Sequence, residues 1–150
     1  MHRLLVPVGA AAILVAGLGP AGTQATPPPP PGASISILKP TGPVTVTKQH
    51  PVVTFKVEVA RVKLSAAHMG KRPAANEGHL QIYADRIPAD AYKKKDLKTT
   101  WLAALAAPTF PLKLASPILK KGTHKIFIAL AQNNYVLYKA NPVSVTITVK

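Results

Sequence analysis

The 150-residue sequence predicts an all-β fold, an antiparallel immunoglobulin-like β-sandwich of about seven strands. Two observations support this prediction. Apolar and polar residues alternate along many short runs, which is typical of strands with one buried face, and turns rich in proline and glycine separate these runs. Cysteine is absent, so burial of valine, isoleucine and leucine has to stabilise the domain without disulfides.

The first 25 residues have the pattern of a secretory signal peptide. A basic start, 1–3, precedes an apolar stretch, 4–18, and small residues at Thr23 and Ala25 predict cleavage after Ala25. A single membrane anchor is the alternative, but the apolar stretch is shorter than the ~20 residues that span a bilayer and is rich in glycine. We therefore predict a periplasmic or secreted protein with no membrane span after cleavage.

Residues 26–34 are predicted to form a proline-rich linker that precedes the domain, residues 35–150. The five consecutive prolines from Pro27 to Pro31 are typical of a polyproline II spacer. A disordered tail without a role and a proline ligand for a partner are the alternatives.

Within the domain, the alternation predicts seven strands and one change of phase. The pattern along 53–59 shifts at Val62, which predicts a bulge or a strand end near Ala60 and Arg61. Residues 65–76 follow neither period and predict a long loop. In the next strand the even positions form the buried face, and the odd positions from 79 to 85 form the other face. The predicted strands are 35–37, 44–46, 53–59, 80–84, 110–114, 126–130 and 143–149.

The segment between Pro88 and Pro108 has a mixed pattern. Lysines are followed here by a Trp-Leu-Ala-Ala-Leu run that can form a helical turn or two. We predict a long crossover with one short helix within 91–106, and Trp101 as a plug over one end of the core.

The chain is strongly basic, with a formal charge of +14 that becomes +13 when residues 1–25 are removed. Fifteen of the 18 cations that remain are lysines, whose hydrated point charges attract anionic polymers, membranes or phosphorylated glycans. Simple solubility is the alternative. Export and the lack of interleaved stacking aromatics argue against nucleic acid as a partner. The candidate anion-binding residues are Lys93, Lys94, Lys95, Lys98, Lys120 and Lys121.

The sequence contains few candidate catalytic groups. It has no cysteine nucleophile, no phosphate-cradling glycine loop and no His-Glu-x-x-His helix, and its five carboxylates form no recognisable pair. Asp85 and His124 can meet on adjacent strands as a base and its orienting group, but no serine stands in a known nucleophile turn. The protein is therefore predicted not to be an enzyme.

Three segments resemble a known family: GHLQIYAD (78–85), KKGTHKIFIALAQNNYVLY (120–138) and PVSVTITVK (142–150). They are similar to small exported bacterial proteins of uncharacterised function with immunoglobulin-like sandwiches. That family has four histidines, in Gly-His-x-His, Gly-x-His-x-Ile and Leu-Ala-x-x-x-His patterns. His79 and His124 match two of them, whereas Gln81 and Tyr135 replace the others. Glutamine and tyrosine bind copper or zinc far more weakly than imidazole, so the resemblance leaves His79 as the centre of any such metal site.

The predicted strand pairing places His79 among polar residues and far from His124. In an antiparallel pair His79 lies opposite 131–133, and six or seven residues at ~3.3 Å each put His124 about 20 Å away, too far to share an ion. The resulting polar cluster suits a sugar or an exposed backbone, and a solvated histidine beside an asparagine turn is the alternative. His124 is expected to cap the core edge with wetted ring nitrogens, and His68 with Met69 is a weaker copper candidate. The candidate ligand-binding residues are His79, Gln81, Asn133, Asn134 and Tyr135.

These observations predict an exported, non-enzymatic binding or structural module whose basic surface is attracted to anionic cell-envelope polymers or glycans. The alternative is a periplasmic copper- or zinc-binding protein centred on His79. No other cofactor is predicted, and the sequence does not indicate an oligomeric state.

Overall fold

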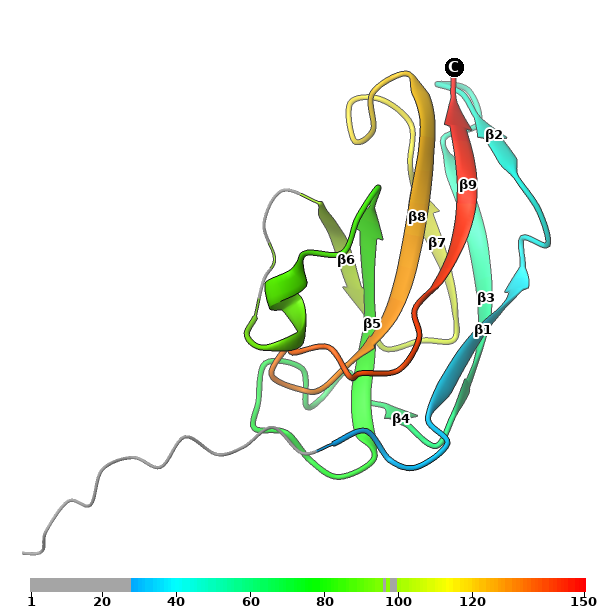
Figure 1. The fold of residues 1–150 in the computed structure, drawn as a ribbon. Coiled ribbons are helices and arrows are strands. Elements are labelled where there is room, and N and C mark those ends of the chain that lie inside the picture. Colours follow the sequence, from blue (N-terminus) through cyan, green and yellow to red (C-terminus); the bar gives the residue numbers. More distant parts are fainter. Residues whose placement is uncertain (1–27, 96, 98–99) are drawn as a thin grey trace, which may run out of the picture.

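The computed structural model describes residues 28–95, 97 and 100–150, which fold into two β-sheets packed face to face (Figure 1). The predicted signal peptide, the first two linker residues and Lys98 lie outside the described residues. The elements are β1 (Ser34–Lys39), β2 (Val44–Val46), β3 (Val52–Ala60), β4 (Lys63–Leu64), β5 (Glu77–Ala84), the 3-10 helix η1 (Ala89–Tyr92), β6 (Trp101–Leu105), β7 (Thr109–Lys113), β8 (Gly122–Ala131) and β9 (Val143–Val149). The predicted β-sandwich is confirmed.

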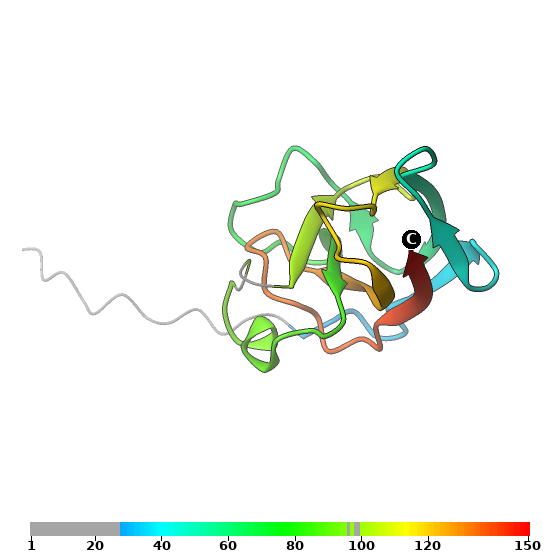
Figure 2. The ribbon, with the colours of Figure 1, turned by 90° about the horizontal axis from the view of Figure 1, so that it is seen from above.

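The two sheets have the strand neighbours of an immunoglobulin-like sandwich. One sheet has the order β1-β3-β7, and the other has the order β2-β9-β8-β5-β4, with β6 paired to β5. These neighbours correspond to the A-B-E and G-F-C strands of that fold. The chain changes sheets after β1, because β2 runs parallel to β9 with Val46 opposite Val149. Figure 2 looks down the sandwich from the end at which β9 finishes.

The core lies between the inner faces of the sheets and follows the predicted alternation. From Val52 to Glu58 in β3 exposed and buried residues alternate, and Phe55 stacks on Phe110 of β7 with ring centroids 5.5 Å apart. β3 ends at Ala60, and Arg61 has the left-handed φ of 64°. The predicted change of phase is therefore confirmed as a strand end. The loop predicted over 65–76 is also found, since this stretch contains no helix or strand.

Two strands occur that the alternation did not predict, β4 and β6. The helical interpretation of Trp101–Leu105 is wrong, because this run forms β6 and pairs antiparallel with β5, with Ile82 opposite Ala103. The crossover does contain one short helix, η1, but it ends at Tyr92. An open edge of β5 offers backbone hydrogen bonds that outweigh a weak local preference for helix. Trp101 is consequently a half-buried strand residue and not a plug in a crossover.

Both faces of β5 are buried, although one was expected to be solvated. The cover comes from η1 and the segment 132–138, which are joined by a hydrogen bond of 2.8 Å from the amide of Leu137 to the carbonyl of Ala91. A second apolar cluster fills the space beneath them. The predicted solvated face is therefore wrong for three fully buried residues, His79, Gln81 and Tyr83, and right for Asp85, which is exposed.

No helix in the described part of the chain is long and apolar enough to cross a membrane.

Candidate functional site

The polar cluster predicted around His79 assembles at the end of β5. His79 pairs with Ala131 of β8, as the antiparallel register requires. The rings of His79 and Tyr135 are in T-shaped contact, with centroids 4.8 Å apart and an angle of 71° between their planes. The side-chain amide of Gln81 donates to the carbonyl of Tyr135 at 2.9 Å and accepts a hydrogen bond from the hydroxyl of Tyr83. Gln81 and Tyr135, 54 residues apart in the sequence, are thus in contact as predicted.

Burial changes what this cluster can do. His79, Gln81 and Asn133 are at most 1% exposed, and Asn134 and Tyr135 are half-buried. Neither ring nitrogen of His79 has a hydrogen-bond partner within the described part of the chain. Burial lowers the pKa of His79 to about 4, so the ring is neutral at pH 7. The solvated histidine expected as an alternative is not found, and the cluster presents little polar surface to a sugar.

The metal alternative lacks a ligand set. His68 Nδ1 lies 2.5 Å from Glu77 Oε2, and this hydrogen bond is the main reason that the pKa of Glu77 is lowered. His68 Nδ1 is therefore occupied by a carboxylate and is not free to bind copper together with Met69. Among the described residues no three His, Cys, Asp or Glu side chains are grouped so that they can hold a metal ion. The residues present around His79 do not fit copper or zinc.

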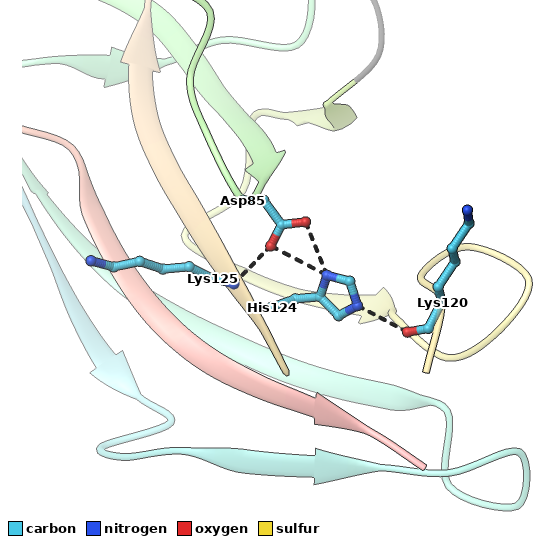
Figure 3. A network of polar contacts seen from close by, with 4 residues as sticks. All are labelled: Asp85, Lys120, His124 and Lys125. Carbon is cyan, nitrogen blue, oxygen red and sulfur yellow. Dashed lines mark hydrogen bonds and ion pairs between the residues drawn. The ribbon is translucent and has the colours of Figure 1, made fainter. Parts of the chain in front are cut away.

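His124 lies at the opposite end of β8, where it links two loops (Figure 3). Its Nδ1 lies 3.0 Å from Asp85 Oδ2, and its Nε2 lies 2.9 Å from the carbonyl oxygen of Lys120. Asp85 also accepts a hydrogen bond of 3.2 Å from the backbone amide of Lys125. The expectation that the ring nitrogens are wetted is wrong, because both are bonded to protein.

Both nitrogens of His124 face oxygen acceptors, which fixes the favoured protonation state. A neutral imidazole has one N–H and satisfies only one of these contacts, whereas the imidazolium donates to both. The hydrogen bond to Asp85 is accordingly the main cause of the raised pKa of His124. The Asp85–His124 pair predicted from the sequence is found. A general base needs a free Nε2, and here that atom is directed at a backbone carbonyl.

The candidate anion-binding lysines form two groups, one at each end of β8. The η1 lysines (Lys93, Lys94 and Lys95) follow η1, and Lys95 Nζ lies 4.4 Å from the centroid of the Tyr135 ring, which follows the end of β8. The loop lysines (Lys120 and Lys121) precede the start of β8. Ten strand residues at ~3.3 Å each place the two groups about 30 Å apart. The sequence pattern alone does not separate the two groups.

Comparisons with known proteins find distant structural similarity only. No protein-family model and no curated protein matches the chain. The fibronectin(III)-like modules of Clostridium thermocellum CbhA are similar with a TM-score of 0.41 and 14% identity, over 77% of this chain and 95% of theirs. The PKD domain of human KIAA0319 is similar with a TM-score of 0.39 and 14% identity, over 89% and 92%. The extracellular domain of the hybrid two-component system BT3049 from B. thetaiotaomicron is similar with a TM-score of 0.42 and 11% identity, over 78% of this chain and 15% of that one.

Proposed function

We propose that this protein is an exported, non-enzymatic binding module that holds anionic cell-envelope polymers through its lysines. One observation supports this most directly. Lys94, which pairs with Asp90 at 3.3 Å, is the only lysine or arginine in the described part of the chain that forms an ion pair with a carboxylate. The other described lysines and arginines, Lys93 and Lys95 of the η1 group among them, form no such pair, so they are free to attract an anionic partner.

The spacing of the lysines favours a polymer over a small anion. The η1 lysines and the loop lysines lie about 30 Å apart along β8. A single phosphate or carboxylate reaches one group only, whereas an extended polyanion contacts both. The β-sandwich between them, with two packed faces on β5, keeps this spacing constant. Individually weak lysine contacts then add up along one chain of ligand.

Catalysis is not part of the proposal, because the groups that resemble a catalytic pair are engaged otherwise. His124 Nε2 contacts a backbone carbonyl, and the cluster around His79 is buried. What remains accessible is positive charge on turns and on exposed strand positions. Surface charge of this kind gives attraction that depends on salt and on charge density rather than on the shape of one ligand.

Retention of the protein on immobilised heparin tests the proposal. We expect retention that falls steeply between about 0.1 and 0.5 M salt, because screening shortens the range of surface electrostatics. Replacing the η1 lysines with glutamine should move elution to lower salt. The matched control replaces three exposed lysines of the other sheet, which we call the sheet lysines: Lys39, Lys56 and Lys113.

The two triple variants lose the same formal charge, so their comparison separates location from net charge. A smaller effect for the sheet-lysine variant supports the proposed surface. Equal effects would reduce the finding to general basicity. Retention that does not respond to salt, or no retention, would remove the proposed function.

Export is tested separately from binding. We expect the chain, produced in a bacterial host with its own N-terminus, to be recovered from the periplasm or medium with a mass that corresponds to cleavage after Ala25. Recovery of the uncleaved chain in the membrane fraction would support the anchor instead.

A further inference from the structure

A hollow surrounded by lysines opens at the end of the sandwich where β9 finishes, near the chain end marked in Figure 1. Its volume is about 310 Å³. Three separate segments contribute to it: the turn between β2 and β3, the residue before β8 and the residue after β9. The lining residues are Thr47, Lys48, Gln49, Lys121 and Lys150. Only Lys121 was a candidate from the sequence, because the parallel pairing of β2 with β9 leaves no local pattern.

Backbone hydrogen bonds hold these three segments together. The amide of Lys150 donates to the carbonyl of Val46 at 3.0 Å, and the amide of Thr47 donates to the carbonyl of His50 at 3.2 Å. Gly122, next to Lys121, pairs with Val149, next to Lys150. The positions from which the three lysine side chains start are therefore fixed before a ligand arrives, which lowers the ordering cost of binding.

The hollow's side chains have one sign of charge. None of the lining side chains is acidic, and Lys48, Lys121 and Lys150 form no ion pair with any described carboxylate. Asp85, at this end of β8, is already hydrogen bonded to His124 and to the amide of Lys125. An anion in the hollow reduces the mutual repulsion of the ammonium groups. The threonine hydroxyl and glutamine amide provide further donors.

We propose that this hollow binds one sulfate or phosphate group of the anionic polymer, an inference that rests on the proposed function. Ammonium groups are compact point charges that can approach a tetrahedral oxyanion from several sides, whereas a planar carboxylate is matched better by the arginine fork. The hollow then fixes one charged group of the polymer, and the η1 lysines contact a later part of the same polymer.

Titration of the ¹⁵N-labelled full chain with inorganic sulfate, and separately with inorganic phosphate, tests the site. We expect saturable amide shifts at the lining residues. In the variant that combines Lys48→Gln, Lys121→Gln and Lys150→Gln, the affinity should be about tenfold weaker, the size to which three exposed charge pairs add up. The sheet-lysine variant should keep the affinity of the unaltered chain. Parallel retention on heparin and on immobilised polyphosphate distinguishes a sulfated from a phosphorylated source.

Two results would overturn the inference. One is a set of amide shifts spread evenly over every turn that contains lysine. The other is an unchanged anion affinity in the variant that combines Lys48→Gln, Lys121→Gln and Lys150→Gln, which we call the hollow variant. If heparin still retains that variant through the η1 lysines, the hollow is wrong and the proposed function stands. Saturable anion binding in the hollow without any retention on polyanions would instead keep the site and remove the polymer.

Discussion

Asp85, the residue after β5, and His124 of β8 lie 39 residues apart and form an ion pair of 3.0 Å that joins the end of β5 to the start of β8. Asp85 reaches this position with the left-handed φ of 64°, which aims its carboxylate at both the imidazole and the amide of Lys125. Because the other nitrogen of His124 faces the carbonyl of Lys120, the pair also ties the loop lysines to the sandwich. Protonation of one ring thus controls a link between two loops.

The first prediction concerns the pH dependence of this link. The pKa of His124 is raised in the folded protein above its ordinary 6.5, mainly by the hydrogen bond to Asp85. The proton therefore stabilises the folded state fully below pH 6.5, and this contribution is lost as the pH rises through the folded-state pKa. Since Asp85 is largely exposed, we expect about 0.5 to 1 kcal/mol. Urea unfolding of the native chain and of His124→Gln between pH 5 and 9 measures the difference.

Asp85→Asn provides the control for this prediction, because asparagine keeps the shape and removes the charge. We expect the NMR titration midpoint of His124 to fall in this variant. An unchanged midpoint would assign the raised pKa to something other than Asp85. A stability difference that grows with pH would contradict the proposed sign.

The second prediction concerns His79, whose pKa is shifted in the opposite direction. Burial lowers it from 6.5 to about 4, so the unfolded chain binds a proton that the folded chain excludes between these pH values. Stability is therefore lost as the pH falls from 6.5 to 4, by about 3 kcal/mol at about 1.4 kcal/mol per pH unit. Urea unfolding of the native chain and of His79→Leu over this interval measures it.

His79→Leu removes the titrating group and leaves every other acid and base in place. Near pH 7.5 the two proteins should differ by about 1 kcal/mol or less, since the ring nitrogens have no described partner to lose. At pH 4 the variant should be the more stable one. Parallel stability curves for the two proteins would show that His79 is accessible to water or has an unseen partner.

The fold could be predicted because alternation reports directly on a half-buried strand. Phe55 and Phe110 are paired on the neighbouring strands β3 and β7 of one sheet, and both are buried on its inner face as their phases require. β6 was missed because Trp101–Leu105 has no alternation, and its strand conformation depends on backbone pairing with Gln81 and Ile82. Backbone hydrogen bonds to a distant strand have no signature in the local sequence.

For the cluster around His79, the sequence predicted which residues are in contact but not that they are buried. Pairing of His79 with Ala131 followed from antiparallel register, and the contact with Tyr135 followed from that pairing. Burial of the same ring depends on η1 and on the segment 132–138, which cover it from outside the sheet. Lys48 and Lys150 were also missed because their position depends on contacts between distant segments. Only the parallel pairing of β2 and β9 brings them together.

The third prediction concerns metal. We expect no stoichiometric binding when the protein is titrated with micromolar Cu(II) or Zn(II), because His79 is buried without a second and third ligand within the described residues. Isothermal calorimetry of the native chain and of His79→Ala provides the measurement. Tight binding that disappears in His79→Ala would revive the alternative of a periplasmic metal-binding protein.

The fourth prediction concerns Gly78, which precedes His79 in β5 and lies against the backbone of Ala131 in β8. A Cβ atom at this position would lie 2.1 Å from the carbonyl oxygen of Ala131 and 3.3 Å from Cε2 of Tyr138. The carbonyl cannot retreat without breaking the pairing between His79 and Ala131, so Gly78→Ala should lower the free energy of unfolding by about 3 kcal/mol or more. Gly42→Ala is the matched control, because nothing lies within 4 Å of its added Cβ atom, and it should change stability by about 0.5 kcal/mol or less. Urea unfolding of both variants at pH 7.5 measures the contrast, and a Gly78→Ala variant as stable as the control would mean that β5 and β8 lie farther apart than this structure has them.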